Sequence, residues 1–266
     1  MQQQDIVTPQ PVESEVIIET RSLSRVYPGV VALDNVNYRV YRNKVNVLIG
    51  ENGAGKSTMM KMLAGVETPS SGEIFLDGTP VSMNSTHQAE KLGISIIFQE
   101  LNLFPNMNVM DNIFMANEFF QKGKINEKYQ YALAQSLLKR LELDVDPYTP
   151  LEELGIGHQQ LVEIARALSK DTRVLIMDEP TSALSQSEVK ILFNVIEQLK
   201  RRGVTIIYIS HRLEELMEIG DYITIFRDGR FISERPVSDA SIPWIIEQMV
   251  GDKKKHFDYQ PAPQGN

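Results

Sequence analysis

One glycine-rich segment constrains the fold of this chain more than any other. It reads Gly50-Glu51-Asn52-Gly53-Ala54-Gly55-Lys56-Ser57-Thr58. The apolar residues 45–49 before it predict a buried strand, and residues 57–64 after it carry apolar side chains at helical spacing. A glycine-rich loop between a strand and a helix is typical of the phosphate-binding loop of α/β nucleotide-binding proteins.

The residue types in this loop match the chemistry of a triphosphate. Glycines allow backbone N–H groups to close around phosphate oxygens, and the helix that follows directs its positive end toward them. We expect Lys56 to reach the terminal phosphates and the Ser57 hydroxyl to ligate Mg²⁺. A glycine-rich turn without a ligand is the alternative, and the flanking strand and helix make it a poor one.

Two carboxylates follow a second apolar run, residues 174–177. Ligands of parallel sheets bind at the carboxyl ends of the strands, which is where Asp178 and Glu179 are expected to lie. Asp178 is suited to hold Mg²⁺ directly or through water, and Glu179 to orient and polarise an attacking water. Alone, the pair could be surface acids that end a strand. The phosphate-binding loop upstream favours the catalytic interpretation.

The remaining patterns predict an α/β fold with two additions. Apolar strands separated by helical segments favour a mainly parallel sheet covered by helices. These strands are expected at residues 94–98, 174–177 and 205–209. Residues 16–41 and 72–78 predict further strands, which we assign to an antiparallel β subdomain. Residues 101–163 break the alternation with helical patterns and predict a helical subdomain inserted in the core.

Composition narrows the class of protein. The 266 residues are 42% hydrophobic, carry a net charge of -8 and include no cysteine, which excludes disulfides and thiolate zinc sites. An acidic balance argues against non-specific nucleic-acid binding. Apolar runs stay below the ~18 residues that span a bilayer, and a signal-peptide layout is missing. We expect a mobile tail at 1–15, one nucleotide-binding domain at 16–250 and a second tail at 251–266.

Motif by motif, the chain from Tyr27 to His211 resembles the ATPase subunit of an ATP-binding cassette (ABC) transporter. Tyr27 matches the aromatic residue that stacks on adenine, Gln99 the Q-loop glutamine and His211 the switch histidine. Residues 154–158 occupy the position of the signature loop. Each of these would be a weak signal alone, because a single tyrosine usually packs and a single polar residue after a strand usually has a structural partner. Gln99 and His211 both follow predicted strands, so we expect them at the same sheet edge as the two carboxylates.

The resemblance implies ATP as substrate and Mg²⁺ as cofactor, with a role for each matching residue. The implied catalytic residues are Lys56, Gln99, Glu179 and His211. The implied nucleotide-binding residues are Tyr27, Gly50, Glu51, Asn52, Gly53, Ala54, Gly55, Lys56, Ser57, Thr58, Gly155 and Gly157. The implied Mg²⁺ ligands are Ser57, Gln99 and Asp178.

The signature loop departs from the family pattern. Family members usually read Leu-Ser-Gly-Gly-Gln, whereas this chain reads Leu154-Gly155-Ile156-Gly157-His158. Gly155 removes a hydroxyl that would donate to the γ-phosphate, a bond worth ~1.5–3 kcal/mol. Backbone N–H groups and a helix amino terminus remain to hold the anion. We predict a weakened composite ATP site; nothing in the sequence explains His158.

Residues 50–55, 98–103 and 159–168 resemble the ribose/galactose class of bacterial sugar importers. This resemblance implies an ATPase that powers import of a sugar or related polyol, peripheral at the cytoplasmic face of the inner (cell) membrane. The implied partners are transmembrane permease subunits, a second cassette that is identical, different or fused, and indirectly a periplasmic or extracellular solute-binding protein. No nucleic-acid partner is expected. Members of this class often carry two cassettes in one longer chain, and this sequence resembles the amino-terminal one.

Two other functions remain open. A soluble, non-transport ABC ATPase that acts on nucleic acid or ribosomes usually carries coiled-coil or basic insertions, which are missing from this sequence. A regulatory cassette with weakened hydrolysis fits Gly155. The intact catalytic residues argue against it: Lys56, Asp178, Glu179 and His211. The apolar side chains after Gln99 also have two interpretations, a groove for the permease or a buried core. They are Leu101, Leu103, Phe104, Met107, Val109 and Met110.

Overall fold

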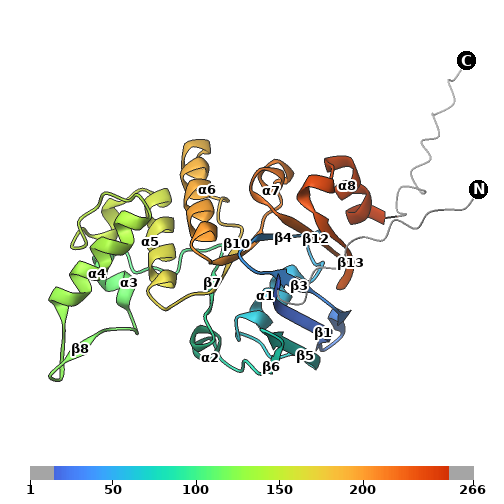
Figure 1. Ribbon diagram of the computed structural model, residues 1–266, viewed down its shortest axis with the longest axis horizontal. Coiled ribbons are helices and arrows are strands. Elements are labelled where there is room, and N and C mark those ends of the chain that lie inside the picture. Colours follow the sequence, from blue (N-terminus) through green and yellow to red (C-terminus); the bar gives the residue numbers. More distant parts are fainter. Residues whose placement is uncertain (1–14, 252–266) are drawn as a thin grey trace, which may run out of the picture.

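A computed structural model describes residues 15–251, so the predicted tails at 1–15 and 251–266 lie almost wholly outside the described residues. A six-stranded sheet in the order β13-β12-β4-β11-β10-β7 forms its centre (Figure 1). These strands are β4 (Val45–Ile49), β7 (Ile94–Ile97), β10 (Val174–Asp178), β11 (Thr205–Ile209), β12 (Tyr222–Arg227) and β13 (Arg230–Pro236). All neighbours are parallel except β12 and β13. The predicted mainly parallel sheet is therefore confirmed.

A second, antiparallel sheet has the order β2-β1-β5-β6, with β3 paired to β1. Its strands are β1 (Val16–Tyr27), β2 (Val30–Val36), β3 (Arg39–Tyr41), β5 (Ser71–Leu76) and β6 (Thr79–Val81). The turn between β5 and β6 places Asp77 and Gly78 at φ 51° and 74°, the left-handed geometry that a tight hairpin requires. This sheet is the antiparallel part of the predicted fold.

Helices bury both faces of the central sheet. They are α1 (Lys56–Leu63), α2 (Thr86–Lys91), α6 (Gln186–Arg201), α7 (Leu213–Ile219) and α8 (Ile242–Val250), with a 3₁₀ helix η3 at Val237–Asp239. Alternate residues of one strand enter different apolar clusters: Met177 packs in the cluster that includes α6, and Ile176 in the one that includes α1. Burial on both faces explains why these strands read as continuous apolar runs in the sequence.

A helical region lies at one end of the molecule, on the left in Figure 1. It contains α3 (Val109–Phe114), α4 (Glu127–Arg140), the 3₁₀ helix η2 (Leu151–Glu153), α5 (Ile156–Leu168) and the short strands β8 (Phe120–Gln121) and β9 (Lys124–Ile125). Val109 and Met110 are buried in its apolar core. These two side chains therefore belong to the core and do not line a surface groove. Phe104 is exposed.

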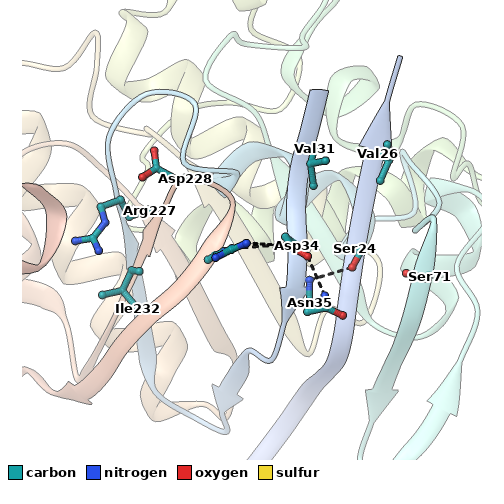
Figure 2. Close-up of a pocket in the computed structure, with 10 residues that line it drawn as sticks. Ser24, Val26, Val31, Asp34, Asn35, Ser71, Arg227, Asp228 and Ile232 are labelled. Atoms are coloured by element: carbon teal, nitrogen blue, oxygen red, sulfur yellow. Dashed lines mark hydrogen bonds and ion pairs between the residues drawn. The ribbon is translucent and has the colours of Figure 1, made fainter. Parts of the chain in front are cut away.

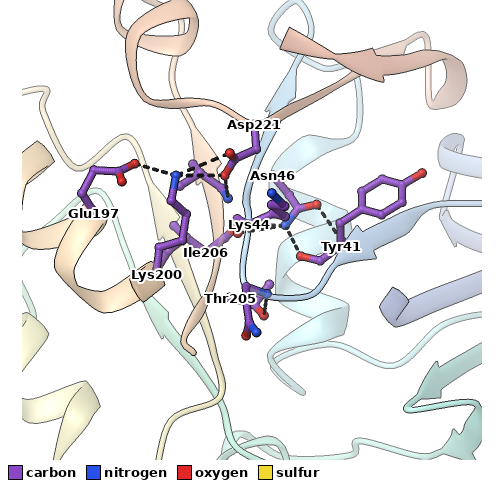
Figure 3. Close-up of polar contacts among 10 residues, drawn as sticks. Tyr41, Lys44, Asn46, Glu197, Lys200, Thr205, Ile206 and Asp221 are labelled. Atoms are coloured by element: carbon purple, nitrogen blue, oxygen red, sulfur yellow. Dashed lines mark hydrogen bonds and ion pairs between the residues drawn. The ribbon is translucent and has the colours of Figure 1, made fainter. Parts of the chain in front are cut away.

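Polar contacts fix the amino-terminal ends of the central strands, away from the glycine-rich loop (Figure 3). The buried Asn46 amide accepts a bond from the N–H of Tyr41 at 2.7 Å and donates to the Tyr41 carbonyl at 2.9 Å. Asp221 accepts from the N–H of Val45 at 2.8 Å and pairs with Lys200 at 3.2 Å. These bonds satisfy buried polar groups and tie β3, β4, α6 and the start of β12 together.

Within residues 15–251, no helix combines the length and the apolar character needed to cross a membrane.

Candidate functional site

The loop between β4 and α1 can form only with glycine at two of its positions. A Cβ on Gly50 would lie 2.3 Å from the Phe226 carbonyl oxygen. Gly55 has a φ of 95°, and a Cβ there would lie 2.6 Å from Leu33 and 2.7 Å from the Ala32 carbonyl. Close packing and a left-handed backbone therefore both require glycine. The loop leads directly into α1, whose first turn offers free N–H groups to an anion.

Lys56, the first residue of α1, folds back across this loop. Its Nζ donates to the Gly50 carbonyl at 2.7 Å and to the Glu51 carbonyl at 3.1 Å. Burial lowers the pKa of Lys56, while the nearby Glu179 and Asp178 carboxylates oppose that shift. The ammonium group is thus bound to two loop carbonyls and is close enough to both carboxylates for their charge to affect its pKa. This arrangement fits the terminal phosphates of a nucleotide together with a cation.

Asp178 is the last residue of β10 and pairs in register with Ile209 of β11. Burial raises the pKa of Asp178, and the neighbouring Glu179 raises it further. The Lys56 ammonium and the Ser57 hydroxyl oppose this rise. A carboxylate beside a hydroxyl supplies the oxygen ligands that Mg²⁺ prefers. Ser57 and Asp178 therefore fit the predicted metal site.

Glu179 and His211 come together although they follow different strands. Glu179 Oε1 lies 3.3 Å from His211 Nδ1, and the imidazole is largely exposed. Glu179 has a φ of 50°, which is unusual for a side chain of this size, and its N–H donates to the Ile209 carbonyl at 2.9 Å. Backbone strain of this kind occurs at functional sites, where the surrounding structure enforces it. The contact places a carboxylate and an imidazole at the sheet edge expected from the sequence.

Glu215 on α7 has a role that the sequence analysis did not identify. Its buried carboxylate accepts bonds from Thr181 at 2.7 Å, Ser210 at 3.3 Å and Arg212 at 2.9 Å. These partners flank Glu179 on one segment and His211 on the other, so Glu215 holds the two segments together. The available signal was an acidic residue one helical turn after His211, in a helix with a buried apolar face.

Tyr27 ends β1 on the antiparallel sheet. Its hydroxyl bonds to the Glu67 carboxylate, and the Arg25 guanidinium lies 4.8 Å from the centre of its ring. Glu67 also contacts Lys61 of α1 at 3.8 Å, which connects the tyrosine to the helix that follows the phosphate loop. Tyr27 is half-buried in this arrangement. Its predicted role in stacking on adenine stays a prediction.

Gln99 lies just after a strand of the central sheet, whereas the signature residues lie at the start of α5, apart from the phosphate-binding loop. Gln99 is exposed and lies just after β7, the neighbour of β10. Gly155 is the amino-terminal cap of α5, and the Gly157 N–H donates to the Glu188 carboxylate at 3.1 Å. In Figure 1, α5 lies well apart from α1. A single chain therefore does not bring its own signature loop to its own phosphate loop.

Figure 2 shows a cavity beside the β1–β2 hairpin and the β12–β13 hairpin. Its volume is about 750 Å³, and an ion pair between Asp34 and Arg230 at 2.7 Å crosses it. None of the predicted site residues lines this cavity. The sequence analysis gave it no role.

Known relatives and structures resemble this chain over most of its length. It is 48% identical over 240 residues to the xylose import ATP-binding protein XylG of Thermoanaerobacter pseudethanolicus, which aligns 90% of this chain with 48% of the relative. It is 46% identical over 252 residues to the ribose import ATP-binding protein RbsA of Rhodopirellula baltica, aligning 94% of this chain with 49% of the relative. The chain thus spans about half the length of these curated relatives.

Solved structures share the fold. The ADP conformation of MJ1267, an ATP-binding cassette of an ABC transporter, superposes with a TM-score of 0.76 at 24% identity, covering 89% of this chain and 99% of that one. A dimeric post-hydrolysis state of the cassette MJ0796, bound to ADP and Pi, superposes with a TM-score of 0.71 at 24% identity, covering 83% and 99%. The ABC transporter family model matches residues 33–182, more than half of the chain. This protein belongs to the ABC transporter family.

Proposed function

We propose that this chain is the ATP-binding and ATP-hydrolysing cassette of an importer for a sugar or related polyol. The observation that carries the proposal is the contact of the Lys56 ammonium with the glycine-rich loop, near enough to Asp178 and Glu179 for their charge to affect its pKa, with His211 3.3 Å from Glu179. Relatives named for xylose and ribose import support the sugar class. Permease subunits at the cytoplasmic face of the membrane would be its partners.

In the proposed mechanism the loop N–H groups and Lys56 bind the β- and γ-phosphates of ATP. Ser57 and Asp178 would hold Mg²⁺, with Gln99 as a further ligand, and the bound ion would supply positive charge next to the phosphates. Glu179 orients a water in line with the γ-phosphate and accepts its proton. His211, whose Nδ1 lies 3.3 Å from Glu179 Oε1, would keep the carboxylate directed at that water.

A second cassette would complete the site. Because α5 lies apart from α1 within one chain, Gly155 and Gly157 would contact ATP held by the phosphate loop of a partner cassette. A related cassette of the same fold is dimeric in its post-hydrolysis state. ATP that favours the closed pair supplies the free energy to move the permease, and hydrolysis reopens the pair.

The experiment that tests this function is Glu179→Gln in the full chain. Loss of a general base lowers turnover by about 10²–10⁴-fold. ATP affinity, measured by titration calorimetry, should stay near that of the wild type. Glu214→Gln, which alters an exposed carboxylate on α7, is the matched control and should leave both quantities unchanged. Retained turnover in Glu179→Gln would remove Glu179 from the mechanism. A wild type that binds but never hydrolyses ATP would favour the regulatory cassette.

A further inference from the structure

One helix binds both backbone hydrogen-bonding groups of Asn102, a residue in the segment after Gln99. The N–H of Asn102 donates to Glu163 Oε1 at 3.1 Å, and the Asn102 carbonyl accepts from Arg166 Nη1 at 2.8 Å. Both side chains belong to α5, the helix that Gly155 caps. The two backbone hydrogen-bonding groups of Asn102 are therefore attached to the signature helix.

A second contact of the same kind follows along the chain. Asn112 of α3 is fully buried, and its Oδ1 accepts from the N–H of Phe104 at 2.7 Å while its Nδ2 donates to the Phe104 carbonyl at 3.0 Å. Leu103, between the two contacts, packs against the apolar core. The chain from Asn102 onward is thus fixed to α3 and α5.

These contacts leave a short connection between the sheet and the helical region. β7 ends at Ile97, and the attachment to α5 begins at Asn102, so only residues 98–101 lie between them. Gln99 lies within this connection. A displacement of the backbone at Gln99 would therefore move Asn102 and, through it, α5 and the signature loop at its amino terminus.

The attachment has an energetic cost, which argues against simple packing. Glu163 is 6% exposed, and its Oε2 has no hydrogen-bond partner among the described residues. Burying a carboxyl oxygen without a partner destabilises a folded protein, and an apolar residue at this position would avoid that penalty. What Glu163 supplies instead is an acceptor for the Asn102 N–H.

We propose that Glu163 and Arg166 are positioning residues that couple Gln99 to the signature loop of the same chain. The inference rests on the proposed function in one respect: Gln99 must respond to the bound nucleotide. The nucleotide state then reaches Gly155 through Asn102 and α5, before a second cassette binds.

A double-mutant cycle between Arg166→Ala and Gln99→Ala tests this coupling. Arg166→Ala should lower kcat several-fold and leave the ATP dissociation constant unchanged. Arg166→Lys, which keeps a hydrogen-bond donor, should have a kcat near that of the wild type. Because the two residues act in series, the double variant should be no slower than Gln99→Ala alone. If the double variant loses kcat by the product of the two single losses, the inference is overturned. Wild-type kcat in Arg166→Ala would also overturn it.

Lys170→Ala is the matched control. Lys170 lies just beyond the same helix and makes a comparable contact, 2.6 Å to Glu90 of α2, but it does not touch the segment after Gln99. Its removal should leave kcat unchanged. Equal losses in Lys170→Ala and Arg166→Ala would assign the effect to general loosening of the helix and overturn the inference.

Hydrogen exchange separates failure of this inference from failure of the proposed function. At a concentration where sedimentation shows a monomer, ATP should change the exchange of amides 156–160 in the wild type and in Arg166→Lys, but not in Arg166→Ala. This readout needs ATP binding and no hydrolysis, so it stands even if the chain is inactive. An equal change in all three proteins, or none in the wild type, would overturn the coupling.

Discussion

At the scale of single residues, Gly155 lacks a hydroxyl that could both cap α5 and donate to the γ-phosphate of ATP. It caps α5 without a side-chain hydrogen bond, and the space where its Cβ would lie is open to 4 Å. Its φ of -62° is accessible to any residue. A side chain is therefore sterically allowed at this position, and its polar groups decide whether it can cap the helix or bind a phosphate.

We predict that Gly155→Ser tightens ATP-driven pairing of two cassettes. A serine there can donate to the γ-phosphate, which corresponds to about 10–100-fold in the dimer dissociation constant for each ATP site that gains the bond, if the bond is worth ~1.5–3 kcal/mol. The measurement is analytical ultracentrifugation with Mg-ATP in the Glu179→Gln background. Gly155→Ala fills the same space without a hydroxyl. If it tightens the pair as much as serine does, the hydroxyl is not the cause.

At the scale of secondary-structure elements, α5 combines three roles in one helix. Its amino terminus forms the signature loop, its apolar face packs in the larger core cluster, and Glu163 and Arg166 hold Asn102. Burial raises the pKa of Glu163 to about 7, although the Asn102 N–H and the Arg166 charge both favour the ionised form. Desolvation is the larger effect because the carboxyl lies in the interior of the helix packing.

We predict that Glu163→Gln gains stability relative to the wild type as the pH rises. An unfolded glutamate titrates near 4.3 and the folded one near 7, so the wild type is most stable, with respect to this group, below pH 4.3 and loses that contribution as the pH rises through 7. The difference between the two proteins should change by about 2–3 kcal/mol from pH 5 to pH 8. Urea unfolding at both pH values measures it.

Glu214→Gln, an exposed substitution on α7, is the control for this pH series. A difference between Glu163→Gln and the wild type that stays constant with pH would show that Glu163 is charged in the folded protein throughout.

At the scale of the whole molecule, the distance between α1 and α5 has the largest functional consequence (Figure 1). The two elements that would surround one ATP lie in separate parts of the chain, so the proposed site needs a second cassette. The curated relatives are about twice as long as the aligned region.

We predict that the tagged protein, purified from its native cells in mild detergent, brings a multi-span permease with it. Mass spectrometry of the eluate identifies the permease and any further cassette. A tagged Lys56→Ala variant, which loses the phosphate-binding ammonium, should retain the permease if docking is independent of ATP. Recovery of only soluble proteins, ribosomes or DNA would instead support the soluble ABC ATPase.

Local signals predicted much of the fold. The strand, loop and helix around Lys56 were expected at residues 45–64 and occur as β4 and α1 (Lys56–Leu63). Helix α5 begins at Ile156, so residues of the signature loop form its first turn. The β12–β13 hairpin was missed, although Asp228-Gly229 between two strand-forming runs is a hairpin signal.

The sequence by itself determined the features that depend on neighbouring residues: the glycine-rich loop, the apolar strands and the carboxylates that end β10. Only the tertiary structure decided which distant residues meet. The contact of Glu179 with His211, the bonds of Glu215 to Thr181 and Ser210, and the attachment of Asn102 to α5 all join separate segments. Their partners follow from strand order and helix packing, which are set by burial of the whole core. No local pattern encodes that global choice.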